Sequence, residues 1–132
     1  MKAPSNTEGS YAACKPNFSG AGRRRRRQIG IVLAVGAVTL AVAFAVLRVA
    51  WYTRLLLFLP VVGAAISLLQ VSRNTCVAHA AAGTFEHEDF STTKQSDQDA
   101  AASRRVAATI YRDAVLLGAM AAALAAATAV LR

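Results

Sequence analysis

The stretch RRRRRQIGIVLAVGAVTLAVAFAVL, residues 23–47, places five consecutive arginines directly before twenty residues without an ionisable side chain. At about 1.5 Å per residue, a helix over residues 28–47 would be about 30 Å long, which matches the hydrocarbon core of a bilayer. Arginines beside a first membrane span keep their side in the cytoplasm and attract anionic lipid headgroups. The sequence therefore predicts an integral membrane protein whose orientation is set by Arg23, Arg24, Arg25, Arg26 and Arg27.

Two further apolar segments follow, at residues 55–71 and at residues 114–131, and the latter is rich in alanine. Both are long enough to cross a bilayer. We expect an all-α protein with three transmembrane helices, in which the first two form an N-terminal helical hairpin and the third is Ala-rich. A buried, non-inserted helix is the alternative for the third segment. Pro60 should bend the second helix, because proline lacks a backbone donor.

The turn of the hairpin, residues 48–54, carries two aromatic and two arginine side chains. The rings of Trp51 and Tyr52 favour the level of the lipid headgroups, and the long side chains of Arg48 and Arg54 can reach the same level from either side. The sequence therefore predicts that this turn lies at a membrane surface.

The net charge of +8 does not by itself indicate a protein that binds nucleic acid. A basic chain can bind nucleic acid, but here the arginine run borders an apolar segment instead of covering a folded surface. We therefore expect no nucleic acid among the partners. A cleaved signal peptide is not expected either, because the apolar region begins only at Ile29 and is too long.

Four regions follow from this pattern: a disordered cytoplasmic tail at 1–27, a helical hairpin at 28–71, a polar cytoplasmic loop at 72–113 and a third span at 114–132. The loop holds six of the seven acidic residues. We expect it to end in an amphipathic helix that starts near Ala100, with Asp97 or Asp99 as the N-cap. Its acidic side chains either pair with the arginine run or dock a basic partner surface.

The distribution of cations predicts the topology. Residues 1–27 and 72–113 carry twelve of the fifteen Lys and Arg side chains, and the hairpin turn and Arg132 carry the other three. Because cytoplasmic segments are enriched in Lys and Arg, the N-terminus is predicted to be cytoplasmic and the C-terminus external. The expected location is a plasma or inner membrane, which the chain would cross more than once.

Small residues recur at intervals of four in all three apolar segments. Lipid supplies no hydrophobic drive between helices, so close packing in a membrane needs small side chains at the contact. The candidates for helix packing are Ala37, Ala41, Ala45, Gly63, Ser67, Gly118, Ala122 and Ala126. The alternative is that an Ala-rich composition produces this spacing by chance.

One group of loop residues has the chemistry of metal ligands: Cys76, His79, Glu86, His87 and Glu88. Their spacing matches no closed zinc site, and the H-E-x-x-H pattern of metalloproteases is missing. We interpret the group as part of a solvated acidic loop and expect neither a metal nor a cofactor. Cys14 and Cys76 both fall on the predicted cytoplasmic side, where thiols stay reduced.

The three predicted spans contain no Asp, Glu, Lys, Arg or His, which disfavours a proton pump or an ion pathway within this chain. We expect a small non-enzymatic membrane protein, acting as an accessory or structural subunit through helix packing and its cytoplasmic loop. Its partners would be the bilayer, anionic headgroups and other membrane protein subunits or a second copy. The alternative is a membrane-surface enzyme or metal-handling protein that uses the loop cluster.

Overall fold

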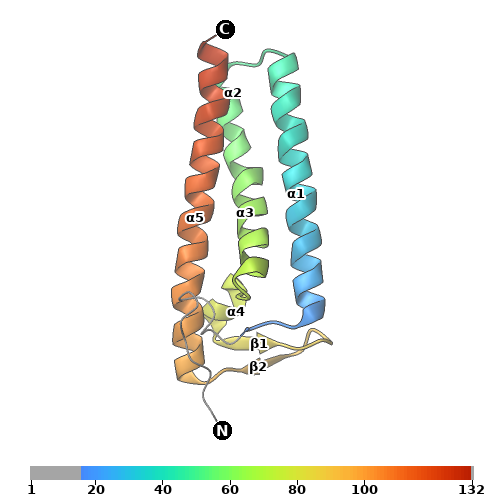
Figure 1. Cartoon of the computed structure of the whole chain (residues 1–132), viewed down its shortest axis with the longest axis vertical. Helices are drawn as coiled ribbons and strands as arrows, with labels where there is room; N and C mark the ends of the chain where they lie inside the picture. The colour runs from blue at the N-terminus through green and yellow to red at the C-terminus, as the bar shows by residue number, and fades with distance from the viewer. Residues whose placement is uncertain (1–15, 132) are drawn as a thin grey trace.

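The structure, a computed structural model, describes residues 16–131, and most of these are helical. Figure 1 shows three long helical segments side by side, with α3 between α1 and α5. They are α1 (Gly20–Val46), then α2 (Trp51–Arg54) with the 3₁₀ turn η1 (Leu55–Leu57) and α3 (Phe58–Ser72), and finally α5 (Asp97–Val130). The short helix α4 (Val77–Ala82) and the strands β1 (Thr84–Glu86) and β2 (Thr92–Lys94) lie together at one end. We call it the hairpin end, after the β-hairpin that β1 and β2 form. The opposite end, where α1 turns into α2, is the turn end.

Three helical segments are long and apolar enough to cross a membrane, judged by length and composition: Gly20–Val46, Trp51–Ser72 and Asp97–Val130. This confirms the predicted helical fold with three such segments. The antiparallel pair β1–β2, with Phe85 opposite Thr93, was not predicted. Neither was α4, so the polar segment is more ordered than its composition indicates.

Helix α1 begins before the arginine run, so Arg23 to Arg27 are helical and do not belong to a disordered tail that extends to residue 27. Ser19 is the N-cap, and its hydroxyl accepts a hydrogen bond from the Gly22 amide at 3.3 Å. The Glu88 carboxylate accepts from the Gly20 and Ala21 amides at 2.9 and 3.2 Å. These contacts satisfy the free amides of the first turn, and Glu88 places a negative charge at the positive end of the helix. Residues 1–15 of the predicted tail, including Cys14, lie outside the described residues.

Helices α1 and α3 both end in a backbone pattern of the Schellman type. Arg48 follows α1 with φ +50°, and the Val49 amide bonds to the Phe44 carbonyl at 3.2 Å. Asn74 follows α3 with φ +51°, and the Thr75 amide bonds to the Gln70 carbonyl at 3.1 Å. Asparagine tolerates this left-handed conformation well, whereas arginine adopts it less readily.

The middle helical segment, from Trp51 to Ser72, departs from regular α-helix about one turn before Pro60. The 3₁₀ turn η1 lies there, after which α3 continues as a regular α-helix. Proline at position 60 cannot donate to the carbonyl of Leu56, and its ring crowds that carbonyl. The irregularity therefore lies where the chemistry of proline predicts it.

Helix α5 runs for 34 residues without a break and joins the predicted amphipathic turn to the third apolar segment. Its N-cap is Ser96, whose hydroxyl accepts from the Asp99 amide at 3.2 Å. The prediction of Asp97 or Asp99 as the cap was wrong, because both lie inside the first turn, where a negative charge still favours the helix dipole.

Close contacts between the helices occur where side chains are small. A Cβ added at Gly118 of α5 would lie 2.4 Å from Val62 Cγ2 of α3. One added at Gly30 of α1 would lie 2.8 Å from Leu68 Cδ2, a contact that was not predicted. Among the predicted packing residues, Ala37, Gly118 and Ala122 are buried, and Ala41, Ala45, Gly63, Ser67 and Ala126 are partly buried.

Candidate functional site

The hairpin end is organised around Asn17, which is fully buried although it lies in the segment predicted to be a tail. Its Nδ2 donates to the Cys76 carbonyl at 2.9 Å, and its Oδ1 accepts from the Cys76 amide at 2.6 Å. Its own carbonyl accepts from the Glu86 amide at 3.0 Å. Through its side chain and its backbone carbonyl, one residue thus joins the segment before α1 to the start of α4 and to strand β1. A single asparagine in a Gly-, Ser- and Pro-rich stretch gives no periodic signal that could have identified it.

Arg26 is the only member of the arginine run that makes an ion pair among the described residues. Its Nη1 and Nη2 donate to the two carboxylate oxygens of Glu86 at 3.4 and 3.2 Å. Nη2 also lies 3.1 Å from the Cys76 Sγ, and the guanidinium carbon stands 4.7 Å from the centre of the Phe18 ring. The planar cation is therefore held on three sides, by a carboxylate, a sulfur atom and an aromatic face.

Glu86 has a second partner in His79. The His79 Nε2 lies 2.7 Å from Glu86 Oε2, and the His79 Nδ1 lies 3.0 Å from the Thr84 Oγ1. Burial by itself raises the pKa of Glu86, but hydrogen bonds from Arg26 and His79 outweigh it and hold that pKa below the ordinary value. Glu86 is therefore charged at neutral pH. We call Arg26, Cys76, His79 and Glu86 the Arg26 cluster.

The structure brings together three of the five candidate metal ligands and separates the other two. Cys76, His79 and Glu86 meet in the Arg26 cluster. His87 instead contacts the Thr93 hydroxyl at 3.0 Å, and Glu88 caps α1. Within residues 16–131, no group of three or more His, Cys, Asp and Glu side chains is placed to hold a metal ion.

The same end carries a second polar link, between α3 and α5. Arg73, just after α3, pairs with Asp113, and its Nη1 donates to the Thr109 hydroxyl at 2.9 Å. Arg112 also bonds to Asp113, with 2.8 Å between Nε and Oδ1. At the hairpin end, charged side chains therefore link α1 to β1 through Arg26 and the end of α3 to α5 through Arg73.

In chemical terms, the Arg26 cluster is an ion-pair network whose acceptors already have donors. A cation at its centre would repel a metal ion and neutralises the carboxylate that a general base would need. Comparisons of the chain with protein-family models, with curated proteins and with solved structures gave no match.

Proposed function

We propose that the chain is a small polytopic membrane protein, with a cytoplasmic N-terminus and an external C-terminus in a plasma or inner membrane. The observation that carries the proposal is the outward direction of its large apolar side chains. Val38 of α1 is 65 % exposed, Leu59 of α3 is 67 % exposed and Leu124 of α5 is 66 % exposed. Such surfaces along three adjacent helices are unfavourable in water and suit hydrocarbon.

The positions of the charges support this proposal. Arg54 and Arg73 bracket the middle segment, and a helix of the intervening length rises about 28 Å, close to the thickness of a bilayer core. Residues 28–47, 55–72 and 114–131 of the three long segments carry no Asp, Glu, Lys, Arg or His. All six acidic residues of the described chain lie in the hairpin-end half.

The orientation rests on the excess of cations at the hairpin end. The arginine run lies there at the start of α1, beside the polar segment that holds Arg73, Lys94 and the arginines of early α5. The turn end has only Arg48 and Arg54 among the described residues. By the positive-inside rule the hairpin end is cytoplasmic. Arg24 and Arg27 are exposed on α1, and each would gain about 1 kcal/mol from anionic headgroups.

For its role we propose a non-enzymatic accessory or structural subunit, which acts through helix packing and the ordered hairpin end. The support is that Arg26 occupies the Cys76 thiol and the Glu86 carboxylate, which an enzyme or a metal carrier would need free. The partner would be another membrane protein or a second copy of the chain.

Two measurements test the proposal. First, the expressed chain should stay in the membrane pellet after alkaline carbonate extraction and dissolve only in detergent; release by carbonate would overturn the membrane assignment. Second, mild detergent extraction should recover a stoichiometric partner or an oligomer. A monomer that copurifies with about one equivalent of zinc, and loses it in a His79→Ala variant, would favour the metal-handling alternative.

A further inference from the structure

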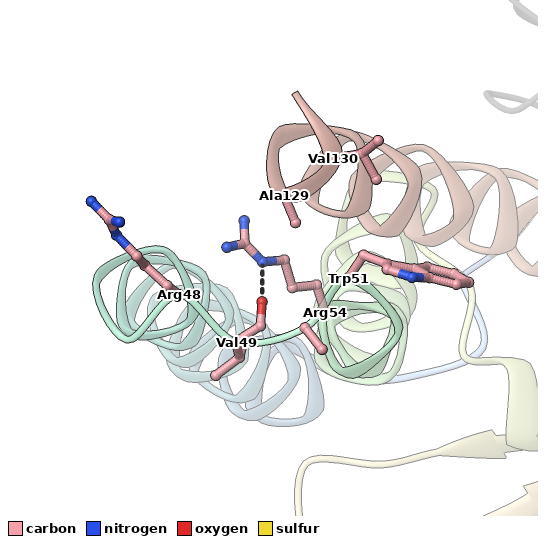
Figure 2. A pocket seen from close by; sticks show the side chains of 7 residues that line it. Arg48, Val49, Trp51, Arg54, Ala129 and Val130 are labelled. Atoms are coloured by element: carbon pink, nitrogen blue, oxygen red, sulfur yellow. Dashed lines mark hydrogen bonds between the residues drawn. The ribbon is translucent and has the colours of Figure 1, made fainter. Parts of the chain in front are cut away.

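At the turn end, a hollow of about 590 Å³ lies between the end of α1, the turn and the last turn of α5. Figure 2 shows the Arg54 side chain extending into the space between Val49 and Ala129, with Arg48 on the α1 side. Trp51 also lines the hollow. Arg54 was predicted to lie at the level of the lipid headgroups, and in the structure its side chain is buried, with only 4 % exposed.

Arg54 is a buried cation whose described partners are all neutral. Its Nε donates to the Val49 carbonyl at 3.3 Å, and its Nη1 donates to the Ala125 carbonyl at 3.3 Å and to the Thr128 hydroxyl at 3.1 Å. Its Nη2 has no hydrogen-bond partner among residues 16–131. A buried charge is costly without an opposite charge beside it, and neutral acceptors compensate only in part.

No carboxylate of the described chain is available to neutralise Arg54. The nearest acidic residue along α5 is Asp113, twelve positions before Ala125, and it is paired with Arg73 and Arg112. Arg48 also lines this hollow and adds a second positive charge, and its side chain makes no hydrogen bond or ion pair in the described structure. Within residues 16–131, the lining of the hollow thus combines two guanidinium groups with no carboxylate.

We propose that this hollow binds a phosphate group, and that the Arg54 Nη2 and the Arg48 guanidinium are its donors. Guanidinium groups form strong charge-assisted hydrogen bonds to phosphate oxygens. The source is an anionic lipid headgroup if the turn end lies at a membrane surface, so this assignment rests on the proposed function. Trp51 favours the same level, because its ring suits the interface between headgroups and hydrocarbon. A free phosphate ion has the same chemistry.

Trp51 is the single tryptophan of the chain, so its fluorescence reports on this hollow directly. Detergent-purified protein would be titrated with short-chain phosphatidylglycerol, short-chain phosphatidylcholine and inorganic phosphate. We expect a saturable change of Trp51 emission with phosphatidylglycerol and a weaker one with phosphatidylcholine, because the choline cation beside the phosphate of phosphatidylcholine is repelled by the two arginines. Saturation by inorganic phosphate at equal or lower concentration would support the site and identify free phosphate as its source.

The variants separate binding from folding. Arg48 is exposed and unpaired in the described structure, so Arg48→Gln should leave thermal stability unchanged and weaken phosphatidylglycerol binding by about tenfold, the loss of one charge-assisted contact. Arg105→Gln, which removes an equal charge at the hairpin end, should bind like the parent. The proposal is overturned if no anion changes Trp51 emission, or if Arg48→Gln and Arg105→Gln bind equally. Because the titration is done in detergent, its failure is distinct from failure of the carbonate extraction.

Discussion

The two ends of this molecule handle buried arginine in opposite ways. At the hairpin end, Arg26 faces Glu86, and the pair is completed by His79 and the Cys76 sulfur. At the turn end, Arg54 is buried more deeply and meets only carbonyl and hydroxyl oxygens in the described structure. An arginine near an apolar helix can thus form one half of an internal ion pair, as Arg26 does, or be held by neutral oxygens alone, as Arg54 is in the described structure. The presence of a nearby carboxylate decides between them.

The largest loss of stability is expected from a substitution in the middle of the molecule, where α5 packs on α3 and so connects the two ends. Gly118→Leu should destabilise the protein by about 3 kcal/mol or more, because even a Cβ there would lie 2.4 Å from Val62 Cγ2 and 3.0 Å from Phe58 Cδ2. Thermal unfolding in detergent measures this. Gly36→Leu is the matched control, since a Cβ at Gly36 meets no atom within 4 Å. Equal losses in both variants would show that α5 does not pack on α3 through Gly118.

The second largest loss of stability is expected when the ion pair between Arg26 and Glu86 at the hairpin end is broken. Glu86→Ala should destabilise the protein by about 3 kcal/mol, because it leaves Arg26 partly buried without its carboxylate. Arg54→Met at the turn end removes a cation with no described counter-charge, so its cost should be lower, at about 1 kcal/mol for the lost hydrogen bonds. Chemical unfolding of both variants in detergent gives the comparison. A greater loss for Arg54→Met would reverse the contrast between the two ends.

Acid should destabilise the hairpin end more than the turn end, because among the described residues only the hairpin end has an arginine paired with a carboxylate. The folded protein holds the pKa of Glu86 below its ordinary value of 4.5. The resulting stability is therefore fully present above about pH 4.5 and is lost as the pH falls through the lower pKa of the folded state. Melting curves between pH 3 and pH 7, run in parallel for Glu86→Gln, should show a weaker acid response in the variant. An identical response would mean that other carboxylates govern it.

The smallest effect concerns the cap that Glu88 forms on α1. Glu88→Gln keeps an oxygen acceptor but removes the charge at the helix N-terminus, so we expect a loss below about 1 kcal/mol. Asp89→Asn is the control, because its carboxylate contacts Ser91 and not the helix. Hydrogen exchange at the Gly20 and Ala21 amides should rise in the first variant only. Unchanged exchange in both would remove Glu88 from the cap.

The sequence predicted the long elements well, because apolar length and the absence of charge are properties of a continuous stretch. All but the last residue of each of the predicted spans 28–47 and 114–131 lies in a long helix, and the irregular turn before Pro60 follows from the ring of proline itself. The hairpin end was predicted poorly. Asn17, Glu86 and Cys76 are far apart in sequence, and their hydrogen bonds exist only once α1 and β1 are side by side.

The same reason explains why the burial of Arg54 at the turn end was not predicted. The residues next to Arg54 in the sequence give no indication that its side chain is buried. The acceptors that draw Arg54 inward, the Ala125 carbonyl and the Thr128 hydroxyl, lie more than seventy residues away on α5. A distant partner of this kind leaves no trace in the local pattern.

We propose that the two ends of the molecule face opposite sides of a membrane, and single exposed cysteines can report the side on which each end lies. Ser91→Cys between β1 and β2 and Ala50→Cys in the turn both introduce exposed thiols, while Cys76 is buried. With Cys14 replaced by serine, intact cells would be treated with a membrane-impermeant maleimide. We expect labelling of the Ala50→Cys variant in intact cells and of the Ser91→Cys variant only after permeabilisation. Labelling of both from the same side, or the reverse pattern, would contradict this proposal.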